Sequence, residues 1–266
     1  MSFSADWLSL REPADHRARA AGLLETLAAW ADQRDSITVL DLGCGTGSNA
    51  RAMIPHLSGT QHWRLVDYDR ALLETAREKL AETSAHKLGA MTVKIEEADL
   101  SRGLEPLLSV DCDLVTASAL FDLVSRPWLD GMVAALAARR LPLYTVLIYD
   151  GIMEWSPAHP ADAAVRDAFN AHQQTDKGFG PAAGPYAGVY LAARLSEAGY
   201  DIATASSPWL LEPQDQELML ANLEGIGAAT GETGFVGEAE LANWLAFRRK
   251  GGTCTVGHVD LLALPR

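Results

Sequence analysis

Three glycines at alternate positions, with acidic residues before and after them, form the part of this sequence best suited to chemistry. Residues 39–49 read VLDLGCGTGSN and contain Gly43, Gly45 and Gly47. Glycine lets a chain turn tightly and lets its backbone approach a ligand closely. Asp67 lies 20 residues after Gly47, the position from which a carboxylate reaches the two ribose hydroxyls of an adenosine group. Together these features predict a site for an adenosine-containing ligand.

The spacing of the glycines distinguishes two kinds of adenosine ligand. The dinucleotide fingerprint requires G-x-G-x-x-G, but Ser48 occupies the place of its third glycine, and the spacing here is G-x-G-x-G. Asp41 precedes the first glycine, where a carboxylate would repel a pyrophosphate and attract the ammonium or sulfonium of an aminoacyl sulfonium ligand. The pattern favours a methyl donor, with a nicotinamide-dependent oxidoreductase as the alternative.

Short apolar segments alternate with helical segments through the first 150 residues and must position this loop. Residues 37–42 are a β-branched and leucine-rich run that ends at the glycines, as a buried parallel strand does. This alternation predicts an α/β fold, a doubly wound and mostly parallel sheet with helices on both faces. Further strands are expected at 62–66, 91–96, 112–117 and 143–149, and helices at about 48–57, 69–80 and 127–138.

The remaining segments are expected to extend this core within one domain, residues 1–266. Residues 1–35 should hold an N-terminal arm over the first ten residues and one helix over 14–32, before a cofactor-binding core at 36–150. A Gly- and Pro-rich stretch predicts a cap insertion at 151–185. The C-terminal part, 186–266, should complete a seven-stranded sheet with strands at 200–205 and 254–264 and a helical insertion at 213–250.

Four segments, in order, resemble the successive motifs of the class I S-adenosylmethionine-dependent methyltransferases. They read DLGCGTGSN, LVDYD, EEADL and DLVTASALFDLV, and the resemblance covers about residues 40 to 150. It implies a Rossmann-like fold, S-adenosylmethionine as the cofactor and methyl transfer as the activity.

The resemblance also implies roles for individual residues. The three loop glycines would face the methionine part of the cofactor, Asp67 would bind the ribose hydroxyls, and Ser118 would approach the methionine end. Asp99 would accept a hydrogen bond from the adenine amino group, with Leu100 alongside. In similar enzymes the N-terminal segment often folds over the cofactor, so Arg11 is a candidate partner for its carboxylate. The expected cofactor set is Asp41, Gly43, Gly45, Gly47, Asp67, Tyr68, Asp99, Leu100, Ser118 and Arg11.

Structural roles compete with several of these assignments. Gly47 could serve tight packing between a helix and a strand, and Asp99 could open a turn before Ser101. Arg11 could be a surface charge. Asp69 is interpreted as a helix cap and not as a ligand contact.

Methyl transfer from a sulfonium needs little catalytic machinery, because the leaving group is already good. The protein has to dock and orient the acceptor and remove a proton where one is lost. The acceptor pocket is expected beyond the fourth and fifth strands. The substrate-binding candidates are Phe121, Asp122, Tyr149, Trp155 and Lys177.

Two residues are candidates for a catalytic role. His172 is the preferred general base, because it shares a predicted helix face with Phe169 and neighbours a flexible loop. Asp150, at the end of the fifth strand, is the second candidate, whereas His258 is expected to be structural. No acidic cluster predicts a magnesium site, although Asp150 leaves that possibility open, and no metal is expected.

The composition narrows the class of acceptor. A net charge of -13 repels phosphate backbones and anionic membranes, so nucleic acid is a disfavoured substrate. The three cysteines are widely spaced, which fits reduced thiols better than disulfides. Neither a leader pattern nor a long apolar run is found in the sequence. We therefore expect a cytoplasmic location. The expected acceptor is a small molecule methylated at oxygen or nitrogen. A non-catalytic adenosine-binding or regulatory module on the same fold is the alternative.

Overall fold

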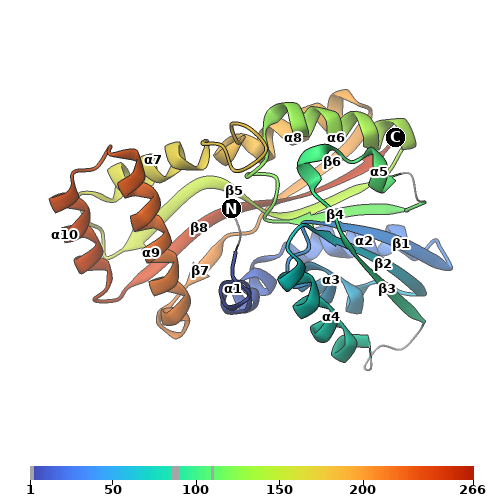
Figure 1. Ribbon diagram of the computed structural model, residues 1–266, viewed down its shortest axis with the longest axis horizontal. Helices are drawn as coiled ribbons and strands as arrows, with labels where there is room; N and C mark the ends of the chain where they lie inside the picture. Colours follow the sequence, from blue (N-terminus) through green and yellow to red (C-terminus); the bar gives the residue numbers. More distant parts are fainter. Residues whose placement is uncertain (1–2, 85–89, 109–110) are drawn as a thin grey trace.

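A single twisted sheet organises the protein (Figure 1). The computed structural model describes residues 3–84, 90–108 and 111–266, and eight strands within these ranges form the sheet, in the order β3-β2-β1-β4-β5-β8-β6 with β7 paired to β8. The strands are β1 (Ser36–Leu42), β2 (Thr60–Asp67), β3 (Met91–Glu97), β4 (Leu114–Ser118), β5 (Leu143–Ser156), β6 (Tyr200–Ser206), β7 (Trp209–Leu211) and β8 (Thr253–Pro265).

The first five strands are parallel, and β8 runs antiparallel to its neighbours β5 and β6. This arrangement confirms the predicted α/β class and the mostly parallel sheet. The one strand that the pattern did not predict is β7, which has three residues and pairs only with residues 254–256 of β8. A run that short lacks the length from which alternation can be recognised.

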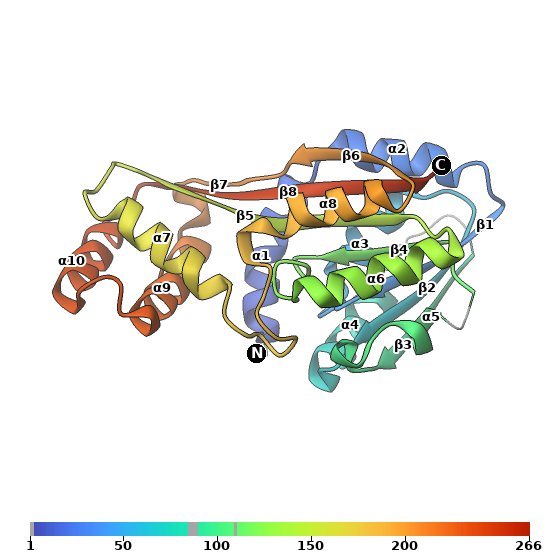
Figure 2. The same ribbon diagram turned by 90° about the horizontal axis from the view of Figure 1, so that it is seen from above.

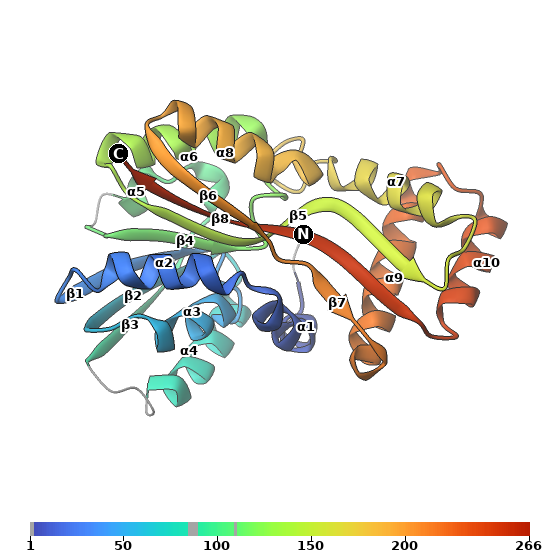
Figure 3. The ribbon, with the colours of Figure 1, turned by 180° about the vertical axis from the view of Figure 1, so that it is seen from behind.

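Helices cover both faces of the sheet, as the alternation predicted (Figures 1 and 3). In both views α6 and α8 lie over one face, and α2, α3 and α4 over the other. The helices are α1 (Ala5–Ala18), α2 (Ala21–Ala31), α3 (Ser48–Met53), α4 (Arg70–Ser84), α5 (Glu105–Leu108), α6 (Arg126–Arg139), α7 (Asp162–Gln173), α8 (Ala187–Glu197), α9 (Gln216–Thr233) and α10 (Glu238–Arg248). Short 3-10 turns lie at Ile54–His56, Leu100–Arg102, Gly184–Tyr186 and Pro213–Asp215.

The central strand β1 explains how the sheet divides the core in two. Leu40 and Leu42 are fully buried in one apolar cluster with residues of α6 and α8, whereas Ile37 and Val39 are buried in a second cluster with residues of α2 and α4. Successive side chains of a strand point to opposite faces, so an uninterrupted apolar run is what a strand covered on both faces requires.

The N-terminal segment differs from its prediction. Residues 5–18 form α1, capped by Ser4, whose side chain accepts a hydrogen bond from the backbone N–H of Trp7 at 3.1 Å. The expected arm and single helix over 14–32 are therefore wrong, because Pro13 lies inside α1 and the chain breaks at Arg19 and Ala20 before α2 begins. Proline most often stands in the first turn of a helix, so Pro13 favours a helix start near residue 14 over a helix that passes through it.

A second lobe is built on the far ends of β5 and β8 (Figure 2). Residues 153–156 of β5 pair with 253–256 of β8, and α7, α9 and α10 pack there around a third apolar cluster. The predicted end of the fifth strand at residue 149 is wrong, because β5 continues to Ser156. Gly151 adopts a left-handed φ of 89° between two stretches of regular pairing, so the glycine bends the strand without ending it.

Candidate functional site

A cavity of about 500 Å³ lies where the parallel strands end. Each of its main contributors follows or ends a different strand: the loop after β1, Asp67 at the end of β2, Asp99 after β3 and Ser118 at the end of β4. Open parallel sheets bind ligands at this edge. We call this space the first cavity.

The loop after β1 shows why glycines are needed there. Gly43, Gly45 and Gly47 have φ values of 61°, 52° and 77°, a region that other residues rarely adopt. A side chain at Gly45 would stand 3.0 Å from a methyl group of Leu8 on α1. Gly43 and Gly45 line the first cavity, whereas the space beside Gly47 is filled by Leu80 of α4. Gly47 therefore allows the loop to pack tightly against α4.

Asp67 joins the loop to the second strand. One carboxylate oxygen accepts a hydrogen bond from the backbone N–H of Gly45 at 2.9 Å, and the other accepts from the N–H of Asp69 at 2.9 Å. Burial raises the pKa of Asp67, and the backbone donors, which include Tyr68, offset part of the rise. A carboxylate has about four lone-pair directions, so these oxygens can still accept hydrogen bonds from a ligand in the cavity.

Asp41 lies behind the wall of this cavity and is fully buried. Its Oδ1 accepts a hydrogen bond from Asn49 Nδ2 at 2.7 Å, and Asn49 itself lines the cavity. Burial raises the pKa of Asp41 to about 7. The structure therefore places Asp41 where it supports Asn49 from beneath.

The other expected cofactor residues lie at the first cavity. Tyr68, Leu100 and Ser118 line it, and so does Asp99, whose Oδ1 also accepts from the backbone N–H of Ser101 at 3.0 Å. The turn-forming and cavity-lining roles considered for Asp99 therefore occur together. Asp69 does not line the cavity, and it caps α4 as expected by accepting from the N–H of Ala71 at 2.9 Å.

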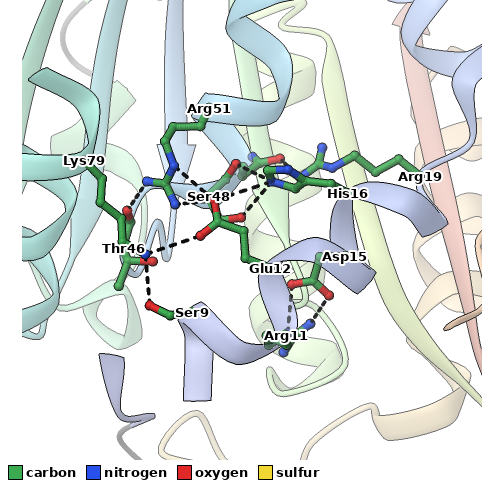
Figure 4. A network of polar contacts seen from close by, with 11 residues as sticks. Ser9, Arg11, Glu12, Asp15, His16, Arg19, Thr46, Ser48, Arg51 and Lys79 are labelled. Carbon is green, nitrogen blue, oxygen red and sulfur yellow. Dashed lines mark hydrogen bonds and ion pairs between the residues drawn. The ribbon is translucent and has the colours of Figure 1, made fainter. Parts of the chain in front are cut away.

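Helix α1 is tied to the glycine loop by an ion-pair network (Figure 4). Glu12 accepts hydrogen bonds from Arg51 of α3, with an Nη2 to Oε1 distance of 2.5 Å, and pairs with Lys79 of α4 at 3.4 Å. Arg51 also donates to the backbone oxygen of Thr46 within the loop. Burial raises the pKa of Glu12, but the two cations outweigh it and lower the pKa overall. This network holds α1 over the loop.

Two more contacts join the end of α1 to the start of α3 (Figure 4). Nε2 of His16 lies 3.0 Å from Oγ of Ser48, and Arg19 donates to Oδ1 of Asn49 at 2.9 Å. Both Ser48 and Asn49 line the first cavity. A helix that the sequence did not predict therefore fixes the shape of the predicted loop.

A second cavity, of about 610 Å³, adjoins the first. Both are lined by Phe3 and Arg11 from the N-terminal segment and by Ala119 and Leu123 from the loop after β4. The second cavity extends from this junction into the lobe, where residues of β5, α7, β7, α9 and β8 form its walls.

Aromatic side chains form much of the wall of the second cavity. Tyr149 and Phe169 stand perpendicular to each other with ring centroids 5.7 Å apart, and Trp209 lies 5.3 Å from the ring of His258. The Arg11 guanidinium lies 5.0 Å over the Trp209 ring and forms a two-point ion pair with Asp15. Such a surface suits a planar, largely apolar ligand.

Two buried polar side chains of the second cavity have atoms without a hydrogen-bond partner among the described residues. They are Oδ1 of Asp122 and Nδ1 of His258. Burial raises the pKa of Asp122 to about 6, with Arg11 opposing the rise. Burial, together with the charge of Arg11, lowers the pKa of His258 to about 3, so this imidazole is neutral at neutral pH.

His172 also lines the second cavity, but both of its ring nitrogens have partners. Nε2 lies 3.0 Å from a carboxylate oxygen of Glu232, and Nδ1 lies 3.3 Å from Nζ of Lys177. Its ring therefore links α7 to α9 and to the loop that follows α7.

With this geometry known, a comparison with protein families decides the class. Residues 39–141 match the model of a family described as a methyltransferase domain. This part of the chain is a methyltransferase domain, of the class I S-adenosylmethionine-dependent type. Its methyl donor is S-adenosylmethionine, and the alternatives of a nicotinamide oxidoreductase and of a non-catalytic module are set aside.

Several solved structures share this fold. A cyclopropane-fatty-acyl-phospholipid synthase-like protein from Lactobacillus casei has 16% sequence identity and a TM-score of 0.56, with 99% of this chain and 95% of that chain covered. A SAM-dependent methyltransferase from Geobacter sulfurreducens, in complex with S-adenosyl-L-homocysteine, has 15% identity and a TM-score of 0.50, with 100% of both chains covered. At these identities the likeness shows the fold alone. No curated protein sequence matched the chain.

The candidates on the acceptor side of the methyltransferase lie in four different places. Asp122 and Tyr149 line the second cavity, and Lys177 lines the first. Phe121 is fully buried in the core, and Trp155 packs against Trp244 at 5.1 Å in the far part of the lobe.

Asp150 lies outside the linings of both cavities, and its Oδ1 accepts a hydrogen bond from the N–H of Ile152. In the described ranges, no group of three or more His, Cys, Asp or Glu side chains could hold a metal ion. The geometry thus gives Asp150 a role in the bend of β5.

Several residues of the second cavity of the enzyme were missed in the sequence. Trp209, Asn222 and Glu232 line it from β7 and α9, and His258 lines it from β8. No local motif marks these positions, because they come together only when β8 returns beside β5. One signal was present in the sequence, since His258 is a titratable residue within an otherwise apolar strand.

No described helix is long and apolar enough to cross a membrane.

Proposed function

We propose that this enzyme transfers a methyl group from S-adenosylmethionine to an oxygen or nitrogen atom of a small molecule held in the second cavity. The observation that carries this proposal is the junction of the two cavities at Arg11, Ala119 and Leu123. Methyl transfer needs donor and acceptor in line and in contact, so two adjoining spaces with a common wall fit the reaction.

The residues of the first cavity fit the methyl donor. Its left-handed glycines allow close approach of the methionine part, and the Asp67 carboxylate suits the ribose hydroxyls. Asp99, with Leu100 beside it, suits the adenine, and Ser118 and Arg11 suit the methionine end. When bound, the sulfonium supplies an activated methyl group. The chain itself has to hold the donor, orient the acceptor and exclude water.

A small molecule fits the second cavity better than a macromolecule does. The lobe covers the space with α7 and α9, and its lining combines aromatic side chains with a few polar groups. Pockets of several hundred Å³ with this kind of lining are typical of small-ligand sites. The net charge of -13 disfavours nucleic acid.

Titration calorimetry and a methylation assay test this function. We expect S-adenosylmethionine and S-adenosylhomocysteine to bind with a stoichiometry of one and NADH to show no binding. With radiolabelled donor, label should pass to compounds in a small-molecule extract and not to the protein or RNA fractions. Transfer to the macromolecular fractions alone would contradict the proposed acceptor class, and tight binding of NADH would contradict the proposed use of the first cavity.

A further inference from the structure

The second cavity contains several groups that could receive a proton, and they differ in what they already bind. The inference below rests on the proposed function of this cavity. Both nitrogens of His172 are occupied by Glu232 and Lys177. The ring of His258 packs against the rings of Trp209 and Tyr149, and burial together with the charge of Arg11 lowers the pKa of this imidazole, so it is a weak base. The remaining candidate is the Asp122 carboxylate, whose Oδ1 has no hydrogen-bond partner in the part of the chain that the structure describes.

Asp122 is also well placed relative to the junction of the cavities. It lines the second cavity together with Ala119, Leu123 and Tyr149. Ala119 and Leu123 also line the first cavity, so an acceptor atom near them would be close to the methyl donor. Arg11, which reaches the same junction, forms its ion pair with Asp15, and Asp122 has no ion pair among the described residues.

The wall around Asp122 indicates the shape of the acceptor. Trp7, Tyr149, Phe169 and Trp209 all line the cavity, and Met153 and Val256 add apolar surface. A flat ring can stack or meet such side chains edge to face. A buried carboxylate with an unpartnered oxygen requires a hydrogen-bond donor from the ligand, because leaving it unmatched is unfavourable.

We propose that the acceptor is an aromatic compound bearing a hydroxyl group, and that the Asp122 carboxylate is the base that takes the proton of this hydroxyl. A neutral hydroxyl is a weak nucleophile, so removal of its proton assists attack, whereas a neutral amine can attack with its own lone pair. The single unpartnered carboxylate therefore favours a hydroxyl over an amine.

The step balances within the two cavities. The acceptor oxygen forms a bond to the methyl carbon as the bond from that carbon to sulfur breaks, and sulfur keeps the electron pair. The proton of the hydroxyl passes to Asp122, which releases it to solvent after the product leaves. No oxidant, reductant or metal takes part in the step.

The electrostatics of Asp122 agree with this role. Burial raises the pKa of the carboxyl to about 6, while Arg11 and the backbone N–H groups of Asp122 and Tyr149 limit the rise. A general base works best when its pKa lies near the working pH and it is still ionised there.

A binding experiment tests the proposal without knowledge of the natural acceptor. The probes are 7-hydroxycoumarin and its methyl ether, 7-methoxycoumarin, titrated into protein saturated with S-adenosylhomocysteine. We expect wild type to bind the hydroxyl compound about tenfold or more tightly than the ether, because only the hydroxyl donates to a carboxylate. Asp122→Asn should remove this preference, with the affinity for the ether changing by less than about twofold.

Two controls separate the possible causes. Asp201→Asn removes an exposed carboxylate of β6 that pairs with Arg266, and it should keep the preference of wild type. Asp122→Glu retains the charge but displaces it, so we expect only a partial preference for the hydroxyl compound over the ether. This variant serves as a second test if Asp122→Asn does not fold. Wild type itself supplies the comparison of hydroxyl with ether in either case.

The outcomes distinguish this inference from the proposed function. If S-adenosylhomocysteine does not bind, the proposed use of the first cavity is contradicted. If it binds but wild type shows no preference for the hydroxyl compound, or binds neither probe, only the aromatic hydroxyl proposal is overturned. An unchanged preference in Asp122→Asn would overturn the assignment of Asp122.

Discussion

The two cavities of this enzyme are built in opposite ways. The first is formed mainly by loops that follow four neighbouring parallel strands within residues 43–123, and its glycine loop is a contiguous motif. The second draws on α1, the loop after β4, β5, α7, β7, α9 and β8, which span nearly the whole chain. The difference shows that the ends of the parallel strands form most of the first cavity, the proposed site of the donor, while the second cavity, the proposed site of the acceptor, depends on the lobe added to them.

The hydrogen bonding of the two cavities differs as well. In the first, both oxygens of Asp67 already accept from backbone N–H groups. In the second, Asp122 and His258 each keep a buried polar atom without a partner among the described residues. The Asp67 carboxylate is therefore held in place before a ligand arrives, whereas the Asp122 carboxylate needs the polar group of a ligand to complete its hydrogen bonding.

The largest effect should come from the second cavity. With 7-hydroxycoumarin as acceptor, Asp122→Asn should lower kcat about 100-fold or more while the affinity for S-adenosylhomocysteine stays within twofold. In wild type, kcat/KM should fall about tenfold per pH unit below about pH 6, because the base must be ionised and protonation of Asp122 removes it. The variant should lose this acid limb.

The groups facing Asp122 make that pH profile interpretable. Besides the Arg11 guanidinium of α1, these groups are Tyr149 from β5, whose pKa is raised by burial, and His258 from β8, whose pKa is lowered to about 3 and lies far below this range. Stopped assays between pH 5 and 8 give the profile. If kcat/KM of Asp122→Asn fell at low pH as it does in wild type, another group would control the pH profile. The proposed difference in hydrogen bonding between the two cavities would then lose its support.

The next largest effect should come from the first cavity. Asp67→Ala should weaken binding of S-adenosylhomocysteine by about 1.5 to 3 kcal/mol, roughly ten- to a hundredfold, through loss of charge-assisted hydrogen bonds. Calorimetry gives the affinity. Asp69→Ala is the matched control, because Asp69 caps α4 and lies outside the cavity lining.

That control should lower stability by about 1 kcal/mol and leave the affinity unchanged. An equal loss of affinity in both variants would mean that the strand end, and not the Asp67 carboxylate, determines donor binding. An unaffected Asp67→Ala would mean that the ribose lies elsewhere.

A smaller effect is expected where α1 meets the loop. Glu12→Gln keeps the shape of the side chain but removes the ion pairs to Arg51 and Lys79, which are worth up to about 1 kcal/mol at a partly buried site. We expect S-adenosylhomocysteine to dissociate about threefold to fivefold faster in stopped-flow measurements, with a weaker effect at high salt. No change in rate would show that apolar packing, such as Leu8 against Gly45, suffices to hold α1 in place.

The smallest effect is expected at His172. Because both ring nitrogens are engaged, His172→Asn should reduce kcat by less than about threefold and should leave the acid limb of the pH profile in place. A loss of 100-fold in kcat, with normal affinity for both ligands, would instead make His172 the base. That result would restore the interpretation that its sequence position suggested.

The sequence determined the donor side to a large extent, and particular residues show why. The positions of Gly43, Gly45 and Asp67 at one edge of the sheet could be predicted because they depend on local backbone conformation and on strand ends, which a short pattern records. Gly47 shows the limit of such a pattern, since it belongs to the motif but packs against Leu80 away from the cavity.

The acceptor side could not be predicted to the same extent. His258 lies in a strand whose pattern indicates burial and nothing about which cavity the side chain faces, and Trp209 lies in β7, which is too short for a pattern. Their positions depend on the pairing of β8 with β5, which ends at Ser156, and with β7, which ends at Leu211, whereas β8 begins only at Thr253, so the pairing is a long-range property. Helix α1 was missed for a local reason, because Pro13 lies inside it and proline is more typical of the first turn of a helix.

A crystal structure of the enzyme with S-adenosylhomocysteine tests the central claim most directly, because it shows where the sulfur lies relative to both cavities. We predict that the ribose hydroxyls lie within hydrogen-bond distance of Asp67, and that the sulfur lies at the junction formed by Arg11, Ala119 and Leu123 and faces the second cavity. A ligand whose sulfur points away from this junction, or lies at another part of the sheet edge, would contradict the account.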